Sequence, residues 1–149
     1  MQTKAFDANE ISIRQAHVSD AEALASLVGE LGYATEPSTA LARLNDSNIA
    51  GDRVLVAVHH SRVIGLILLH RTPFLHRPPD GRISTLVVSA DYRGRGVGGR
   101  LIEAAESVFR EMQCERVEVS SGAQREDAHR FYLRAGYTEQ PKRFIKVLA

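Results

Sequence analysis

The sequence contains a single cysteine, Cys114, and no apolar run long enough to cross a membrane. One thiol excludes an intrachain disulfide and a cysteine-based zinc site. A membrane helix needs about 18 or more consecutive apolar residues, and the first ten residues, MQTKAFDANE, lack the apolar core of a signal peptide. These absences predict a cytoplasmic protein with no membrane partner.

An excess of charge of one sign is also lacking, because 19 basic residues face 18 acidic ones and the net charge is +1. This balance argues against a nucleic-acid partner. The charges are nevertheless segregated along the chain: residues 1–50 carry 3 basic and 7 acidic groups, and residues 51–100 carry 8 and 3. A polyanion would therefore prefer the middle of the chain, and a cation its beginning.

The chain is long enough to bury a core of its own. It has 149 residues, of which 44% are hydrophobic and 25% are charged, as in an ordinary globular domain. It has no internal repeat, low-complexity tract or long linker. We therefore expect one domain over residues 1–149.

Hydrophobic periodicity predicts the elements of the first half. A strand is expected over 10–16, followed by a helix that starts at the S-x-x-E pattern of Ser19 and Glu22 and ends at Gly32. A shorter helix fits 38–48, and two strands over 53–59 and 63–70 form a hairpin. The stretch 71–81 contains three prolines and is expected to be a loop.

The second half alternates strands and helices. A buried strand over 83–89, a turn over 91–99, an amphipathic helix and a strand over 116–120 follow one another, which predicts a parallel strand pair. A helix over 124–135 is expected to stop at Gly136, and the tail over 137–148 is expected to return as a last strand. The order predicts an α/β fold with a mixed sheet.

The most informative segment is the turn Asp91–Arg100, DYRGRGVGGR, between the buried strand and the amphipathic helix. Glycines accept positive φ and let backbone N–H groups approach a ligand closely, and a helix N-terminus attracts negative charge. The turn holds four glycines and three arginines: Gly94, Gly96, Gly98, Gly99, Arg93, Arg95 and Arg100. Together they predict a cradle for a phosphate group.

Two nucleotide-binding patterns compete for this turn. Gly94, Gly96 and Gly99 satisfy G-x-G-x-x-G, which is typical of dinucleotide-binding folds. However, three residues separate the strand from the first glycine, and only one strand–helix–strand unit is available. No Gly-Lys-Ser/Thr follows, so a nucleoside-triphosphate loop is disfavoured as well. A nicotinamide-dependent oxidoreductase is kept as an alternative.

The segment resembles another family more closely. Arg93-x-x-Gly96-x-Gly98, after the strand residues Leu86-Val87-Val88, resembles the acyl-CoA pyrophosphate signature of the GCN5-related N-acetyltransferase (GNAT) superfamily. The segment 128–137, AHRFYLRAGY, is similar to the second conserved block of that family. The resemblance covers essentially the whole chain, with specific motifs only over 83–137. It implies a mostly antiparallel sheet of about six to seven strands, with a splayed parallel pair at the cofactor and about four helices.

The resemblance also implies a mechanism and its residues. An amine attacks the thioester of acetyl-CoA directly, and Tyr132 matches the tyrosine that protonates the leaving thiolate in many members. The implied cofactor-binding residues are Leu86, Val87, Val88, Arg93, Gly94, Arg95, Gly96, Val97, Gly98, Gly99 and Arg100. No metal is expected, because His59 and His60 are adjacent on a predicted strand and should point to opposite faces.

The general base is not predicted by a motif. Members of the family often carry an acid on the strand before the cradle, where this chain has Ser84 and Thr85. The candidates near the expected acceptor side are Glu30, Glu36, His70 and His76. A second departure is Arg125, where the family often has an asparagine that contacts pantetheine; Ser120 or Ser121 could substitute.

These observations predict an N-acetyltransferase that moves the acetyl group of acetyl-CoA to a primary amine of a small molecule or peptide. A non-catalytic acyl-CoA-binding or sensing module is the alternative, favoured by the missing strand carboxylate and opposed by Tyr132. The acidic first third favours a cationic acceptor. A homodimer, common in the family, is a further possibility.

Overall fold

The computed structural model describes residues 5–120, 126–140 and 143–148. It divides into two compact units, residues 1–119 and residues 120–149. The first unit contains the sheet and three of the α-helices. The second contains α4, Glu126–Arg134, and the C-terminal segment.

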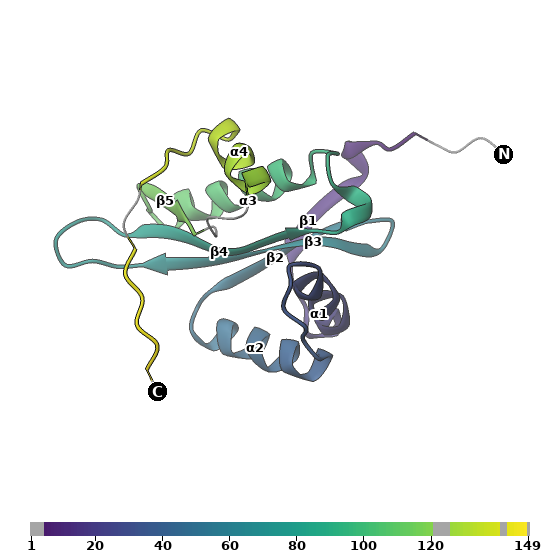
Figure 1. Cartoon of the computed structure of the whole chain (residues 1–149), viewed down its shortest axis with the longest axis horizontal. Helices are drawn as coiled ribbons and strands as arrows, with labels where there is room; N and C mark the ends of the chain where they lie inside the picture. The colour runs from purple at the N-terminus through teal and green to yellow at the C-terminus, as the bar shows by residue number, and fades with distance from the viewer. Residues whose placement is uncertain (1–4, 121–125, 141–142, 149) are drawn as a thin grey trace. The chain divides into compact units, whose positions relative to one another are not determined.

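The first unit is built on a five-stranded sheet in the order β1-β2-β3-β4-β5 (Figure 1). Three neighbouring pairs are antiparallel, and β4 and β5 are parallel, so the predicted mixed, mostly antiparallel sheet is confirmed. The strands are β1 Ile11–Gln15, β2 Arg53–His59, β3 Arg62–Thr72, β4 Asp80–Val88 and β5 Arg116–Val119.

Helices cover both faces of this sheet (Figure 1). The helices α1, Ala21–Glu30, and α2, Pro37–Ile49, pack on one face, and α3, Val97–Glu111, packs on the other. With α4, the described residues contain four α-helices, as predicted. Three short 3-10 turns accompany them: η1 Ala8–Glu10, η2 Val18–Asp20 and η3 Ala90–Tyr92.

Two apolar layers hold the helices to the sheet. On the first face, Leu24, Leu27 and Leu44 of the helices meet Val56, Leu66 and Val87 of the strands. On the other face, the ring of Phe109 lies directly against Gly81, where an added Cβ would come within 2.4 Å of the ring. Any side chain at that position would displace α3 from the sheet.

The two ends of α1 test the capping predictions. The predicted cap at Ser19 is wrong, because Ser19 lies inside η2 and Asp20 instead accepts a hydrogen bond from the His17 N–H at 2.7 Å. The predicted stop at Gly32 is confirmed. Gly32 has φ +110°, and the N–H groups of Gly32 and Tyr33 close back onto Gly29 and Val28.

The proline-containing loop is shorter than predicted. β3 continues to Thr72 and β4 begins at Asp80, so only residues 73–79 lie outside the sheet. The strand continues until the first proline removes a backbone donor at residue 73. Residues 80 and 81, predicted as loop, belong to β4.

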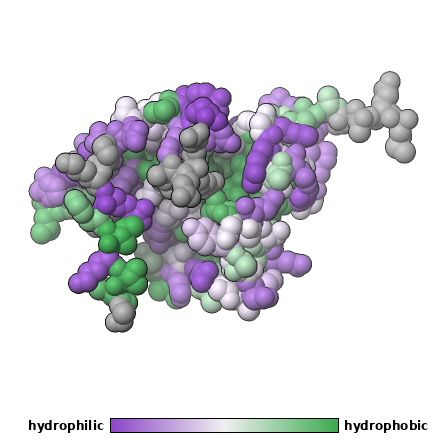
Figure 2. All heavy atoms as spheres, in the orientation of Figure 1, coloured by the Kyte–Doolittle hydropathy of each residue, from purple (hydrophilic) through white to green (hydrophobic). Residues whose placement is uncertain are grey.

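The sheet has fewer strands than the six to seven expected. The predicted last strand over 137–148 is wrong for the residues that the structure describes, since 137–140 and 143–148 form no strand. Apolar side chains of this segment, including Phe144 and Val147, are exposed, and Figure 2 shows green surface where the C-terminal segment ends. Apolar residues form a strand only where their backbone groups meet a neighbouring edge.

No helix within the described parts of the chain is both long enough and apolar enough to cross a membrane.

Candidate functional site

The glycine-rich turn leads from β4 through η3 into α3, as predicted. Gly94 has φ +75° and Gly96 has φ +82°, a left-handed conformation that side chains with a Cβ rarely adopt. Gly96 is the N-cap of α3. A Cβ added at Gly94, Gly96 or Gly99 would meet no atom of the described residues within 4 Å. The turn therefore presents bare backbone to the outside.

The first turn of α3 supplies donors for an anion. The first N–H groups of an α-helix have no intrahelical acceptor, and in this helix they belong to Val97, Gly98 and Gly99. The next one, of Arg100, is already bonded to the Gly96 carbonyl at 3.1 Å. Three N–H groups beside a left-handed turn, together with the positive end of the helix dipole, form an arrangement that binds phosphate.

The three arginines of the turn have different partners. Arg93 donates from Nε to the Val88 carbonyl at 3.2 Å. Arg95 lies 5.0 Å from the ring centre of Phe6. The Arg100 guanidinium donates to the carbonyls of Ala8 and Ile11, so its side chain fixes the segment before β1.

The edge of β4 next to the turn is open among the described residues. β5 pairs with β4 only over Asp80–Ile83. Since the Ser89 N–H bonds to the Ile64 carbonyl of β3, alternation directs the backbone groups of Leu86 and Val88 to the opposite edge. The Val88 carbonyl on that edge accepts from Arg93. Among the described residues, the pairing of β4 with β5 therefore ends at Ile83, although β4 continues to Val88.

Asp80 holds the beginning of the parallel pair, where it lies opposite Arg116. Its carboxylate accepts two bonds from Arg77, at 2.6 and 3.1 Å, and two from Arg116, at 3.3 and 3.2 Å. Only 3% of the residue is exposed. The Arg77 hydrogen bond, assisted by Arg116, lowers the pKa of the Asp80 carboxyl group.

A polar relay lies near the middle of β4. His70 of β3 contacts Ser84 of β4 through Nε2, at 2.5 Å from the hydroxyl, and contacts Asp52 through Nδ1, at 3.1 Å from the carboxylate. With an ionised Asp52, Nδ1–H donates to the carboxylate and Nε2 accepts the Ser84 proton. This connectivity is the one by which a carboxylate orients an imidazole as a proton acceptor.

The relay depends on an irregularity in the sheet. Leu68 pairs with Thr85 and Leu69 pairs with Ile83, so Ser84 is the extra residue of a β-bulge. A bulge redirects a side chain out of regular alternation. Here it brings the Ser84 hydroxyl to His70.

The other predicted base candidates have different surroundings. Glu30 accepts a hydrogen bond from the Ala90 N–H of η3 at 3.0 Å. Glu36 is exposed at the N-cap of α2, and the exposed His76 packs its ring against Phe74. Of the four candidates, only His70 has a carboxylate on one ring nitrogen and a hydroxyl on the other.

Arg82 adds an unusual cation beside the relay. It is the cross-strand partner of His70, and directly paired residues project from the same face of a sheet. Its Nε is buried and has no hydrogen-bond partner among the described residues. A buried donor without an acceptor is costly, so this position favours an anionic ligand.

Tyr132, the predicted general acid, lies on α4 in the second unit. It is half-buried, and its ring contacts those of Phe131 and Tyr137. Its catalytic role stays a prediction. Ser120 is half-buried, whereas Ser121 and Arg125 lie outside the described residues.

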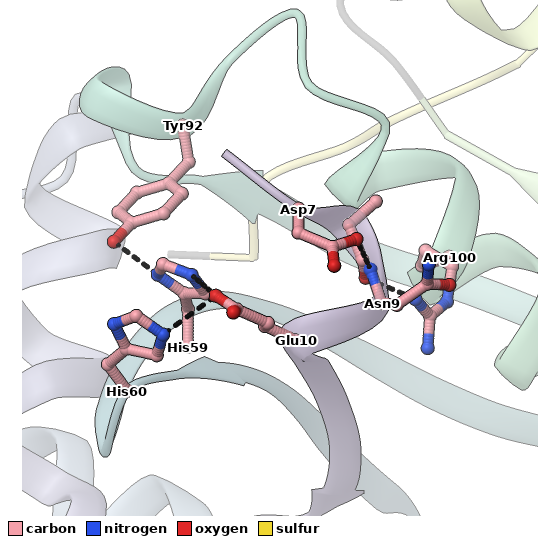
Figure 3. A network of polar contacts seen from close by, with 8 residues as sticks. Asp7, Asn9, Glu10, His59, His60, Tyr92 and Arg100 are labelled. Carbon is pink, nitrogen blue, oxygen red and sulfur yellow. Dashed lines mark hydrogen bonds and ion pairs between the residues drawn. The ribbon is translucent and has the colours of Figure 1, made fainter. Parts of the chain in front are cut away.

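The prediction that His59 and His60 point to opposite faces is wrong. His60 has φ +46° and belongs to the turn between β2 and β3, so strand alternation does not apply to it. The two imidazole rings stack with their centres 4.0 Å apart. Both rings reach Glu10, and His59 also contacts the Tyr92 hydroxyl (Figure 3).

Sequence reasoning missed Asp52, Arg82 and the Glu10–His59–His60 cluster. The signal for Asp52 and Arg82 was weak, because their proximity to His70 follows from strand register. A stronger signal existed for the cluster. His60, Ser61 and Arg62 lie between the two predicted strands, so His60 belongs to a hairpin loop, where strand alternation does not hold.

Comparisons with known proteins agree with this geometry. Residues 21–137 match the model of the Acetyltransferase (GNAT) family. The chain is 34% identical to the aminoalkylphosphonate N-acetyltransferase of Salmonella typhimurium over 142 residues, which cover 91% of this chain and 90% of the relative.

Solved structures of acetyltransferases share the fold. A GNAT family acetyltransferase of Staphylococcus aureus superposes with a TM-score of 0.79 at 25% identity, over 93% of this chain and 99% of that one. A putative acetyltransferase of Agrobacterium tumefaciens superposes with a TM-score of 0.83 at 23% identity, over 92% and 99%.

Proposed function

Because this chain belongs to the acetyltransferase (GNAT) family and is an N-acetyltransferase, we propose that it transfers acetyl from acetyl-CoA to the primary amine of a small molecule. One observation carries the proposal. The left-handed glycine turn opens α3, and the last residues of β4 before it have no partner from β5 among the described residues. A ligand with an anionic group and an amide-rich chain fits both surfaces.

In this proposal the backbone, more than the arginines, holds the cofactor. The N–H groups of Val97, Gly98 and Gly99 bind the pyrophosphate. The Arg95 guanidinium adds positive charge, whereas Arg100 supports the site by fixing the segment before β1. The backbone groups of Leu86 and the N–H of Val88 pair with the pantetheine amides, as an added strand pairs with a sheet edge. The Val88 carbonyl already accepts from Arg93.

His70 is the proton acceptor in this proposal. Ser84 lies two residues before Leu86, about 7 Å along the strand, so the relay lies beside the acyl end of a pantetheine chain paired at Leu86. The ammonium group of the acceptor gives one proton to His70 Nε2, directly or through the Ser84 hydroxyl. Asp52 holds the imidazole in the tautomer that this step requires.

Bond making and bond breaking then balance. The neutral amine nitrogen bonds to the carbonyl carbon of the thioester while the C–S bond breaks. The CoA thiolate takes a proton, which we assign to Tyr132, and the second proton of the nitrogen passes through solvent to restore the Tyr132 hydroxyl. The proton on His70 passes to solvent, and the products are an N-acetyl amine and CoA.

For the acceptor, we infer a small primary amine that also carries a phosphonate or a similar anion. The 34%-identical relative is an aminoalkylphosphonate N-acetyltransferase, and the buried Arg82 Nε beside His70 suits an anionic group. The cationic acceptor favoured by the acidic first third has weaker support, because Glu30 is bonded to the Ala90 N–H.

The test is release of free CoA thiol from acetyl-CoA in the presence of a panel of amines. The panel contains aminoalkylphosphonates, polyamines, aminoglycosides, amino acids and peptide N-termini. We expect the highest kcat/KM with an aminoalkylphosphonate, and a KM for that acceptor at least tenfold higher in Arg82→Gln. A preference for polyamines would support the cationic acceptor instead.

Calorimetry with acetyl-CoA separates the remaining alternatives. Tight binding without turnover of any amine would favour the sensing module. Protection by NAD but not by CoA in a melting assay would favour the oxidoreductase. An acetyl group found on Ser84 by mass spectrometry would replace direct transfer with a covalent intermediate.

A further inference from the structure

Glu10, His59 and His60 form a cluster in the first unit that the proposed reaction does not use (Figure 3). Glu10 ends η1, His59 ends β2, and His60 lies in the following turn. Glu10 Oε2 lies 2.8 Å from His60 Nε2 and 3.4 Å from His59 Nε2. One ligand atom of each residue lies within 4.8 Å of the other two.

We propose that this cluster binds a divalent transition-metal ion of the Zn²⁺, Co²⁺ or Ni²⁺ class. Two imidazoles and one carboxylate are a ligand set that such ions prefer, whereas Mg²⁺ and Ca²⁺ prefer oxygen ligands. Metal–ligand bonds of about 2.0–2.1 Å in tetrahedral geometry place ligand atoms about 3.4 Å apart. The cluster meets this separation after small side-chain movements.

The surroundings of His59 also suit a ligand. Its Nδ1 lies 2.9 Å from the Tyr92 hydroxyl, while its Nε2 faces Glu10. A second hydrogen bond of this kind fixes the tautomer and the ring orientation of metal-binding histidines. The side chain of His59 is 11% exposed and that of His60 is 63% exposed. The cluster is therefore preorganised on one side and open to an entering ion on the other.

The backbone conformation of His60 is a second reason to place a metal ion at this cluster. His60 and Ser61 have φ +46° and +64°, and they form the two-residue turn of the β2–β3 hairpin. Such turns favour asparagine followed by glycine, and a histidine with positive φ is strained. The strained conformation places the His60 ring in a stack with that of His59 and within reach of Glu10.

An ion at this site would join three segments. Glu10 precedes β1, His59 and His60 connect β2 to β3, and Tyr92 belongs to η3, which leads into the glycine-rich turn. The inference replaces the expectation of no metal, which rested on the two rings pointing apart. It does not depend on acetyl-CoA or on the acceptor.

The test is Zn²⁺ and Co²⁺ binding to the full chain, without an affinity tag and stripped of metal beforehand. We expect one ion per chain by equilibrium dialysis, and the visible absorption of Co²⁺ should report nitrogen and oxygen ligands. At a free Zn²⁺ concentration 100 times the Kd, the melting temperature should rise by about 5–10 °C. Mg²⁺ should produce neither effect.

Variants locate the ion. His60→Asn places a residue that the turn prefers, so the protein should fold as well as the parent while losing the bound ion. Tyr92→Phe should weaken Zn²⁺ binding about 10- to 100-fold. His76→Ala is the matched control, because it removes an exposed histidine of the 73–79 loop, and its affinity for Zn²⁺ should equal that of the parent.

Three results would overturn the proposal. The first is the absence of saturable Zn²⁺ or Co²⁺ binding to the folded parent. The second is an unchanged affinity in His60→Asn, and the third is loss of the ion in His76→Ala.

Discussion

The strand β4 contributes to two proposed sites that are built in different ways. After its end, the cradle is made of consecutive residues, Arg93–Arg100, and of backbone groups. Near its middle, the relay brings Ser84 to His70, 14 residues away in the chain, and His70 to Asp52 before β2. The cradle depends on local backbone conformation, whereas the relay depends on strand register. The two should therefore respond differently to substitution.

His70→Ala should have the largest effect, and it should fall on the relay alone. Removing a positioned general base lowers kcat about 10²- to 10⁴-fold, while the affinity for acetyl-CoA, measured by calorimetry, should stay within about twofold. The control is His76→Ala, which should have the kcat of the parent. An unchanged kcat in His70→Ala would remove the relay from the mechanism.

Asp80→Asn tests whether the ion pairs at the start of β4 support the relay at Ser84. The variant leaves Arg77 and Arg116 without their shared carboxylate and should lower the free energy of unfolding by about 1–3 kcal/mol. Since Asp80 anchors β4 far from the glycines, kcat should fall more than the affinity for acetyl-CoA. Equal losses would mean that the two sites are not separable.

The pH dependence of this variant has a defined sign. The arginines lower the pKa of Asp80 from its ordinary value of 3.8. The stabilisation is therefore present above about pH 4 and is lost as the pH falls through the lowered pKa. Urea denaturation at several pH values should show the parent and Asp80→Asn differing most above pH 5 and converging in strong acid.

Gly99→Ala tests the cradle alone. Gly99 lies in α3 with no atom of the described residues within 4 Å of an added Cβ, so alanine should raise the stability by about 0.5–1 kcal/mol. The same methyl group would occupy the space of a phosphate, so the Kd of acetyl-CoA should rise about tenfold, or about 1.4 kcal/mol. A gain in stability together with weaker binding of acetyl-CoA would identify Gly99 as part of a ligand-binding surface.

Gly29→Ala is the matched control for this measurement. Gly29 is also helical and also has open space around an added Cβ. It should gain stability without any change in the Kd of acetyl-CoA. If both variants bind acetyl-CoA as the parent does, the pyrophosphate does not lie against Gly99.

The same contrast explains what the sequence could predict. The glycine-rich turn and the stop of α1 at Gly32 were predictable, because positive φ is a local requirement that glycine satisfies. The relay was not, since it requires the bulge at Ser84, and no residue type encodes that irregularity. The orientation of His60 was predicted wrongly because both histidines were assigned to a strand, whereas His60 belongs to the turn that follows it.

Glu30 and Glu36 give the smallest effects and separate two interpretations of the acidic first third. If these residues attract a cationic acceptor, Glu30→Gln and Glu36→Gln should each raise the acceptor KM and leave that of acetyl-CoA unchanged.

The structure favours another outcome for Glu30. Its carboxylate accepts the Ala90 N–H at the start of η3, so Glu30→Gln should weaken a charge-assisted bond and cost about 0.5–1 kcal/mol of stability. Steady-state kinetics should then show the larger change in the acetyl-CoA KM, with Glu36→Gln unchanged. Equal increases of the acceptor KM in both variants would restore the cationic acceptor.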